Sequence, residues 1–160
     1  MPDGPRLLIE GACYHLMVRG NNKQRVFTNN EDLNRYLGML KKYKRKYKFK
    51  MYGYCLMPNH VHIIGLAEEP KNLAKFMHGL NRAYAGYFNK TYNRVGHLWQ
   101  GRFKSMVIVQ DKYLIDCINY VELNPIRANI VKSPCAYLWS SYRERNMLEI
   151  SVGLLDEISL

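Results

Sequence analysis

The chain changes between two spacings of apolar residues, and each spacing predicts one kind of element. Runs rich in β-branched and aromatic residues, bounded by turn residues, predict strands at 14–19, 49–56, 60–66 and 106–109. Apolar residues three and four positions apart predict helices over 33–47 and 73–88. Asp111 can cap a third helix, whose core-facing residues would be Leu114, Ile118 and Val121.

The order strand, helix, strand, strand, helix, strand is the split βαβ pattern. It predicts an α+β, ferredoxin-like (RRM-like) sandwich with an antiparallel sheet and helices packed mainly on one face. The third helix follows this unit. We expect one domain over 1–145 and then, at 146–160, a C-terminal arm or the start of an extension.

Basic residues are concentrated in the middle of the chain. The formal net charge is +11, and residues 33–110 contain 15 Lys or Arg but only two acids, Glu68 and Glu69. Such an imbalance is typical of proteins that bind a polyanion, because each cation set against a phosphate releases counterions. An anionic membrane surface is the competing partner, but the apolar stripes of the helices are needed for the core. Nucleic acid is therefore favoured, and no membrane partner is expected.

The cellular compartment is also predicted from composition. No run of 18 apolar residues could cross a bilayer, and residues 1–13 lack the apolar segment of a secretion signal. The four cysteines are scattered without a Cys-x-x-Cys pair, which indicates reduced packing residues. We therefore expect a cytoplasmic protein.

Two histidines lie two positions apart at the start of a predicted strand. His60 and His62 would project from the same face, because side chains alternate along a strand. Two neighbouring neutral imidazoles can bind one divalent cation. The alternative is a pair of half-buried strand histidines bonded to carbonyls, since a bare His-x-His is a weak signal. His15, on the first strand, is a candidate third ligand or a structural histidine.

A metal site, a basic surface and 13 tyrosines allow one scheme for cutting DNA. A tyrosine hydroxyl attacks a phosphodiester and forms a covalent phosphotyrosine, while a divalent ion polarises the phosphate. Asn124 lies four residues after Tyr120 and would share its helix face as a third ligand. However, Pro125 disfavours a helical Asn124, so Asn124 could instead cap a new short helix.

The loop before the fourth strand combines an aromatic residue with basic ones. Trp99 with Arg102 and Lys104 would offer a stacking surface and phosphate-binding charge, as single-stranded nucleic acid requires. The alternative is that Trp99 packs beneath the loop.

Five ordered blocks together resemble a known family. They are residues 14–21 (YHLMVRGN), 57–62 (MPNHVH), 99–104 (WQGRFK), 120–128 (YVELNPIRA) and 139–142 (WSSY). The combination resembles the IS200-like single-tyrosine (Y1, HUH) transposases, most closely their REP-associated branch. The resemblance spans residues 10–145, so the predicted domain would be a transposase domain.

The resemblance implies a histidine-hydrophobic-histidine endonuclease and strand transferase. It acts on single-stranded DNA beside an imperfect hairpin, uses Mg²⁺ or Mn²⁺, and would be nucleoid-associated when bound. By similarity, His60 and His62 bind the metal, Asn124 is the third ligand, and Tyr120 is the nucleophile that leaves a 5′-phosphotyrosine and a free 3′-hydroxyl. The candidate DNA contacts are Arg19, Asn21, Arg82, Trp99, Gln100, Arg102, Lys104 and Arg127. Asn129 departs from the glycine that the family often has, which affects a turn and not the chemistry.

A second hypothesis comes from a different functional class. A non-catalytic, single-stranded nucleic-acid-binding protein on an RRM-like sheet would also need basic and aromatic residues. A metal-dependent adduct on Tyr120 separates the two hypotheses. The sequence leaves open whether the protein is a monomer or a homodimer.

Overall fold

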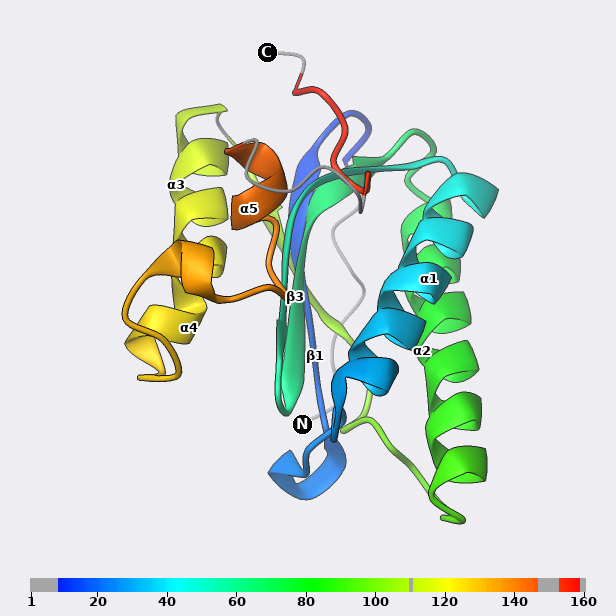
Figure 1. Cartoon of the computed structure of the whole chain (residues 1–160). Coiled ribbons are helices and arrows are strands. Elements are labelled where there is room, and N and C mark those ends of the chain that lie inside the picture. The colour runs from blue at the N-terminus through cyan, green and yellow to red at the C-terminus, as the bar shows by residue number, and fades with distance from the viewer. Residues whose placement is uncertain (1–8, 110, 147–152, 159–160) are drawn as a thin grey trace.

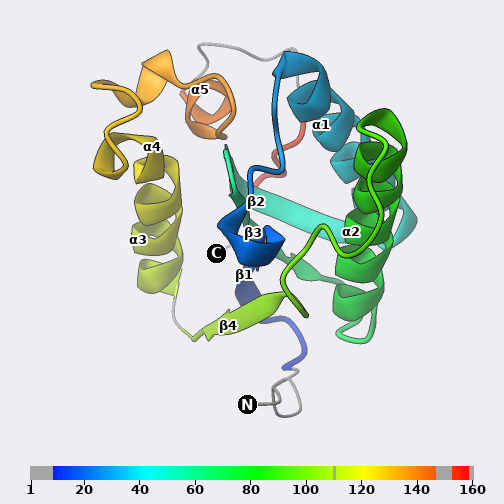
Figure 2. The ribbon, with the colours of Figure 1, turned by 90° about the horizontal axis from the view of Figure 1, so that it is seen from below.

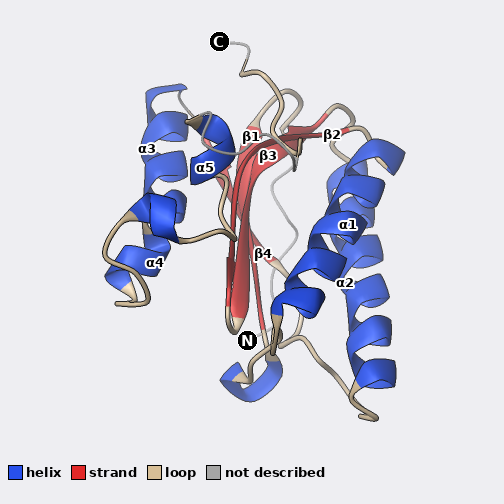
Figure 3. Cartoon of the chain, in the orientation of Figure 1, coloured by secondary structure: helices blue, strands red, loops and turns tan. Residues whose placement is uncertain are grey.

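The computed structural model describes residues 9–109, 111–146 and 153–158. Its centre is a sheet of four antiparallel strands in the order β2-β3-β1-β4, seen edge-on in Figures 1 and 3. The strands are β1 (Cys13–Arg19), β2 (Phe49–Met57), β3 (His60–Ala67) and β4 (Lys104–Ile108). This order and direction confirm the predicted ferredoxin-like sheet.

Helices α1 (Asn30–Lys46) and α2 (Asn72–Thr91) cover one face of the sheet. Tyr14, Leu16 and Val18 alternate along β1 into the core beneath them. The α1 helix begins where the Asn29 side chain accepts a hydrogen bond from the Asp32 amide at 3.0 Å. This layer matches the predicted pair of helices on one face.

The third helix, α3 (Asp111–Glu122), packs against the opposite face, so the sheet is covered on both sides (Figure 2). Leu114, Ile118 and Val121 are buried there, as predicted, in a second and smaller core. Three short elements follow on the same side, namely α4 (Asn124–Arg127), the 3₁₀ helix η2 (Pro134–Ala136) and α5 (Tyr142–Arg145). The face of the sheet that carries His60 and His62 is the face covered by α3.

A segment after η2 pairs with the outer edge of β2. The Leu56 amide donates to the Trp139 carbonyl at 2.8 Å, and the Ser141 amide donates to the Tyr54 carbonyl at 2.9 Å. A short antiparallel bridge joins Cys55 to Ser140. This pairing satisfies backbone groups on a strand edge that would otherwise be open.

The same segment holds the end of α3 through a buried carboxylate. Glu122 is only 2% exposed and accepts hydrogen bonds from Ser141 Oγ at 2.5 Å and from Arg145 Nε at 3.1 Å. Arg145 also donates to the Tyr52 carbonyl on β2. One ion pair therefore ties α3, α5 and the sheet together.

The last described residues also contact the sheet and α1. The Asp156 amide donates a hydrogen bond to the Met51 carbonyl on β2, and the Met51 amide donates to the Asp156 carboxylate, each at 2.8 Å. The same carboxylate forms an ion pair with Lys44 Nζ at 2.8 Å. Leu154 is fully buried beside them. Within the predicted arm 146–160, residues 147–152 and 159–160 lie outside the described residues. No helix in the described part of the chain is long and apolar enough to span a membrane.

The Glu122–Arg145 pair generates a stability prediction. Arg145→Ala leaves a buried carboxylate without its cation, which should lower the free energy of unfolding by about 3 kcal/mol. Urea unfolding measures this loss, with Arg45→Ala on the exposed side of α1 as the control. The double variant Glu122→Gln/Arg145→Ala should lose less than Arg145→Ala alone, because it leaves no buried charge. Equal midpoints for Arg145→Ala and Arg45→Ala would contradict the prediction.

Candidate functional site

The candidate site begins with the two histidines at the start of β3. The Pro58–Asn59 turn reverses the chain, so His60 is paired on both sides, with Met57 of β2 and Arg19 of β1. His60 is half-buried, whereas His62 is only 5% exposed. Their ring centroids are 4.9 Å apart with the rings edge to face. The imidazoles are thus adjacent on one face of the sheet, as the alternation predicted.

Each histidine has one ring nitrogen engaged. His60 Nδ1 lies 2.7 Å from Asn59 Oδ1, and His62 Nδ1 lies 2.8 Å from His15 Nε2. An amide oxygen can only accept, so His60 Nδ1 carries the proton and its Nε2 keeps a free lone pair. In both rings the nitrogen left for another partner is Nε2.

Burial keeps both rings neutral. It lowers the pKa of His60 to about 4, with the Arg19 charge adding to the effect. It also lowers the pKa of His62 to about 3, where His15, His60, Arg127 and Arg19 lower it further. A neutral imidazole is the form that ligates a metal, so protons do not compete near neutral pH.

The surroundings of the pair are basic. No group of three or more His, Cys, Asp or Glu side chains able to hold a metal occurs among the described residues. His15 therefore lies behind His62 as its hydrogen-bond partner and does not complete a three-histidine site. An ion here would be held by two imidazoles and by neutral or phosphate oxygens.

Tyr120 projects from α3 on the same side of the sheet and is 54% exposed. Its ring is covered by Arg127 of α4, whose guanidinium carbon lies 3.9 Å from the ring centroid. Arg127 also donates to the Tyr120 carbonyl. The positive charge of Arg127 also contributes to the lowered pKa of His62.

Asn124 does not continue the helix of Tyr120. The helix ends at Glu122, and Asn124 is the first residue of α4, with Leu123 in the capping position and no side-chain cap hydrogen bond. The capping role considered for Asn124 is therefore not found. Its half-buried amide forms no hydrogen bond with the residues that the structure describes.

Four of the predicted DNA contacts lie around one small hollow. Arg19, Gln100, Arg102 and Lys104 line it with Met17 and Val18. The Gln100 amide donates to the Arg19 carbonyl at 2.8 Å, which fixes the loop beside β1. Arg19 is also the register partner of His60, so this basic hollow adjoins the histidine pair.

The neighbouring loop requires a glycine at Gly20. A β-carbon there would lie 2.3 Å from the Gln24 carbonyl oxygen. Gly20 also forms an antiparallel bridge with Trp99, and the Asn21 amide donates to the Leu98 carbonyl at 2.8 Å. Asn21 begins the 3₁₀ helix η1 (Asn21–Lys23). The chain around residue 20 is thus locked to the basic loop.

Trp99 is a core residue at this position. It is 9% exposed, and its Nε1 donates to the Asn81 carbonyl at 3.0 Å. This placement favours the packing alternative over an open stacking surface. Exposed Arg82 and Arg102 line a second hollow beside the remaining edge of Trp99.

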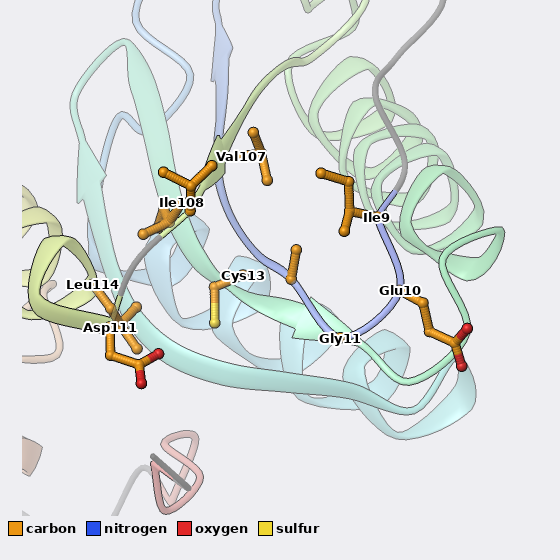
Figure 4. Close-up of a pocket in the computed structure, with 10 residues that line it drawn as sticks. Ile9, Glu10, Gly11, Cys13, Val107, Ile108, Asp111 and Leu114 are labelled. Atoms are coloured by element: carbon orange, nitrogen blue, oxygen red, sulfur yellow. The ribbon is translucent and has the colours of Figure 1, made fainter.

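Another pocket of about 250 Å³ lies at the far end of β1 (Figure 4). Its walls come from the segment before β1, from the end of β4 and from the start of α3. Its charged residues are the acids Glu10 and Asp111, and the rest of its lining is mostly apolar. A phosphate would be repelled here, so this pocket is not the DNA site.

Sequence reasoning missed the partners of the ring nitrogens. Asn59 could have been found, because it directly precedes His60 at a strand turn. The contact of His15 with His62 depends on strand register, and the stacking of Arg127 on Tyr120 depends on how α4 follows α3. Neither of these two contacts has a local sequence signal.

The chain belongs to the family of IS200-like transposases, because that family's profile, described as "Transposase IS200 like", matches residues 9–124. A Haemophilus influenzae protein named as a REP-associated tyrosine transposase is 26% identical over 151 residues, covering 88% of this chain and 85% of its own length. The fold is also that of a REP-associated tyrosine transposase solved with a REP hairpin, at a TM-score of 0.75 and 22% identity over 98% of this chain and 89% of that one.

More distant structures share the fold alone. A transposase from Deinococcus radiodurans has a TM-score of 0.50 at 18% identity, covering 76% of this chain and 96% of that one. A tRNA(His) guanylyltransferase from Saccharomyces cerevisiae has a TM-score of 0.53 at 11% identity, covering 76% and 62%. Because differently named enzymes share the sheet, function has to be argued from the site.

The lowered histidine pKa values give a pH prediction. As pH falls below about 6.5, the unfolded chain binds protons before the buried rings of His60 and His62 do. The stability contributed by these neutral rings should therefore be present above a pH of about 6.5. It should be lost as pH falls toward the folded-state pKa values, which are about 4 for His60 and about 3 for His62. Imidazole ¹⁵N shifts of the metal-free protein should stay constant from pH 7.5 down to 5.5, and His62→Gln should flatten the stability profile. Rings that protonate near pH 6.5 would contradict the prediction.

Proposed function

We propose that this chain is a metal-dependent single-stranded DNA endonuclease and strand transferase that acts through a covalent phosphotyrosine. The observation that carries the proposal is the pair of neutral imidazoles, each with its Nδ1 engaged and its Nε2 bonded to no described residue, adjoined by a basic hollow. An exposed tyrosine projects on the same side of the sheet. Membership of the transposase family supports the same reaction class.

The residues present fit a divalent ion such as Mg²⁺ or Mn²⁺. His60 and His62 would hold it through Nε2, and the Asn124 amide oxygen, which is free of a cap hydrogen bond, is the candidate third ligand. When bound, the ion would polarise a non-bridging phosphate oxygen and neutralise charge in the transition state. Without a carboxylate among the ligands, the site stays attractive to a phosphate.

Tyr120 would supply the nucleophile. Its phenolic oxygen forms the bond to phosphorus, the bond from phosphorus to the 3′-oxygen breaks, and the products are a 5′-phosphotyrosine and a free 3′-hydroxyl. Because Tyr120 is 54% exposed, solvent can take up the phenolic proton and supply one to the departing 3′-oxygen, while the Arg127 cation over the ring would stabilise developing negative charge. Attack by another DNA hydroxyl reverses the chemistry and joins strands.

The proposed substrate is single-stranded DNA beside a short imperfect hairpin. A relative of the same fold is described as bound to a REP hairpin. In this chain, Arg19, Arg102 and Lys104 would contact phosphates on the side of the histidines, with Gln100 beside them. Arg82 and Asn21 remain candidates at the edge of the same loop. Arg127 contacts Tyr120 in the structure, so its main proposed role is at the tyrosine, and contact with DNA is a secondary one.

A non-catalytic binder remains the competing function, favoured by one observation. Basic residues line both hollows beside the loop, and these would bind a single strand without any metal or nucleophile. Such a protein would not need the paired free Nε2 atoms.

Tyr120→Phe should abolish cleavage and the covalent adduct while leaving hairpin DNA affinity within about twofold, because the ring that Arg127 covers is kept. Incubation with Mn²⁺ and a labelled oligonucleotide, followed by denaturing electrophoresis, measures both products. Tyr113→Phe, an exposed tyrosine on the same helix, is the matched control and should cleave normally. His60→Ala should lose metal binding and cleavage together. Equal cleavage by the Tyr120→Phe protein would exclude this nucleophile.

Removing charge from the hollow should change the salt dependence of binding. Arg102→Ala/Lys104→Ala should reduce the slope of log affinity against log salt by about 1.4 for single-stranded DNA, about 0.7 for each lost phosphate contact. Lys75→Ala/Lys112→Ala removes the same charge from exposed positions outside both hollows and should leave the slope unchanged. Fluorescence anisotropy of labelled single-stranded DNA at several salt concentrations measures the affinity of each double variant. Identical slopes for the two double variants would contradict the assignment.

A further inference from the structure

We infer that His15 is a positioning residue, which holds His62 in the tautomer that leaves Nε2 free to ligate the metal. The inference deepens the proposed function and rests on it. His15 would act only through His62, without touching the ion or the DNA.

The strand register creates the contact. His15 is opposite Ile64 and His62 is opposite Met17, so the two histidines are diagonal neighbours on one face of the β1–β3 pair. Long side chains can meet across such a diagonal. His15 Nε2 lies 2.8 Å from His62 Nδ1, and the ring centroids are 5.0 Å apart.

The bond between two neutral imidazoles has two possible directions. If His15 Nε2 donates, His62 Nδ1 accepts and the proton of His62 sits on Nε2, which blocks that atom as a ligand. If His62 Nδ1 donates, His15 Nε2 accepts and the lone pair of His62 Nε2 is free. Only the second direction allows His62 to bind a metal, because its Nδ1 is already occupied by His15.

The neighbouring ligand shows the same arrangement with no ambiguity. Asn59 Oδ1 must accept from His60 Nδ1, so Asn59 fixes the tautomer of His60. In the same way, His15 would accept the Nδ1 proton of His62 and fix the tautomer of that ring. Partners of this kind orient a metal-bound imidazole and raise its affinity, and losing one typically costs 10-fold to 100-fold.

The test compares two substitutions at one position. His15→Gln places an amide oxygen near the position of Nε2 and can still accept from His62, whereas His15→Phe keeps a ring but cannot accept. Long-range ¹H–¹⁵N correlation spectra of the metal-free protein report the tautomer of His62. Titration of Mn²⁺, followed by the electron paramagnetic resonance signal of the free ion, gives the affinity.

The unsubstituted protein and the His15→Gln variant should both show the Nδ1–H form of His62 and should bind Mn²⁺ with similar affinity. His15→Phe should shift His62 toward the Nε2–H form and weaken Mn²⁺ binding about 10-fold to 100-fold, while metal-free hairpin DNA binding stays unchanged. An Nε2–H His62 in the unsubstituted protein would overturn the inference even if neither variant folds. Equal Mn²⁺ affinity of folded His15→Phe would overturn it too. Failure of the unsubstituted protein to bind Mn²⁺ would instead overturn the proposed function.

Discussion

The pairing of β1 with β3 is the constraint on which the site depends. Its register sets Arg19 opposite His60 and brings His15 diagonally to His62, so one ladder of backbone hydrogen bonds fixes both a cation and a hydrogen-bond partner beside the histidines. A slip of one residue would turn every side chain of β1 to the other face. Tyr14, Leu16 and Val18 resist that slip, because they are buried under α1 and α2. The apolar face therefore specifies the geometry of the polar face.

The opposite layer has a different task, since it packs a helix against the sheet while Tyr120 on that helix stays 54% exposed. Leu114, Ile118 and Val121 anchor α3 by one stripe, and this leaves Tyr120 on the exposed side. The small second core is supplemented by the ion pair of Glu122 with Arg145, which fixes the end of α3 close to Tyr120. A buried ion pair is a poor source of net stability, because the cost of desolvating both charges offsets much of their attraction. Placement of the tyrosine, more than stability, is what such a contact would supply.

The spacing of apolar residues predicts the four strands and the buried residues of α3. It can do so because burial of an apolar side chain depends on its position within its own strand or helix. The predicted fourth strand begins at residue 106, whereas β4 begins at Lys104. Lys104 and Ser105 are polar and join the sheet only by pairing with Met17 and Leu16 of β1. The break between α3 and α4 was foreseen at Pro125, but the helix already ends at Glu122. Contacts such as Arg145 with Glu122 depend on packing between distant segments and leave no periodic trace in the sequence.

The fold and the reaction are separable in this protein. A guanylyltransferase shares the sheet at 11% identity, so four antiparallel strands with helices on them do not decide the chemistry. In this chain the polar groups of the candidate site are only partly engaged by other described residues. Asn59 and His15 each engage one nitrogen of a ring and leave the other without a described partner, and Arg127 covers a face of Tyr120, which stays 54% exposed. Among the described residues, each of these two rings therefore keeps one nitrogen that a partner from outside the chain could engage.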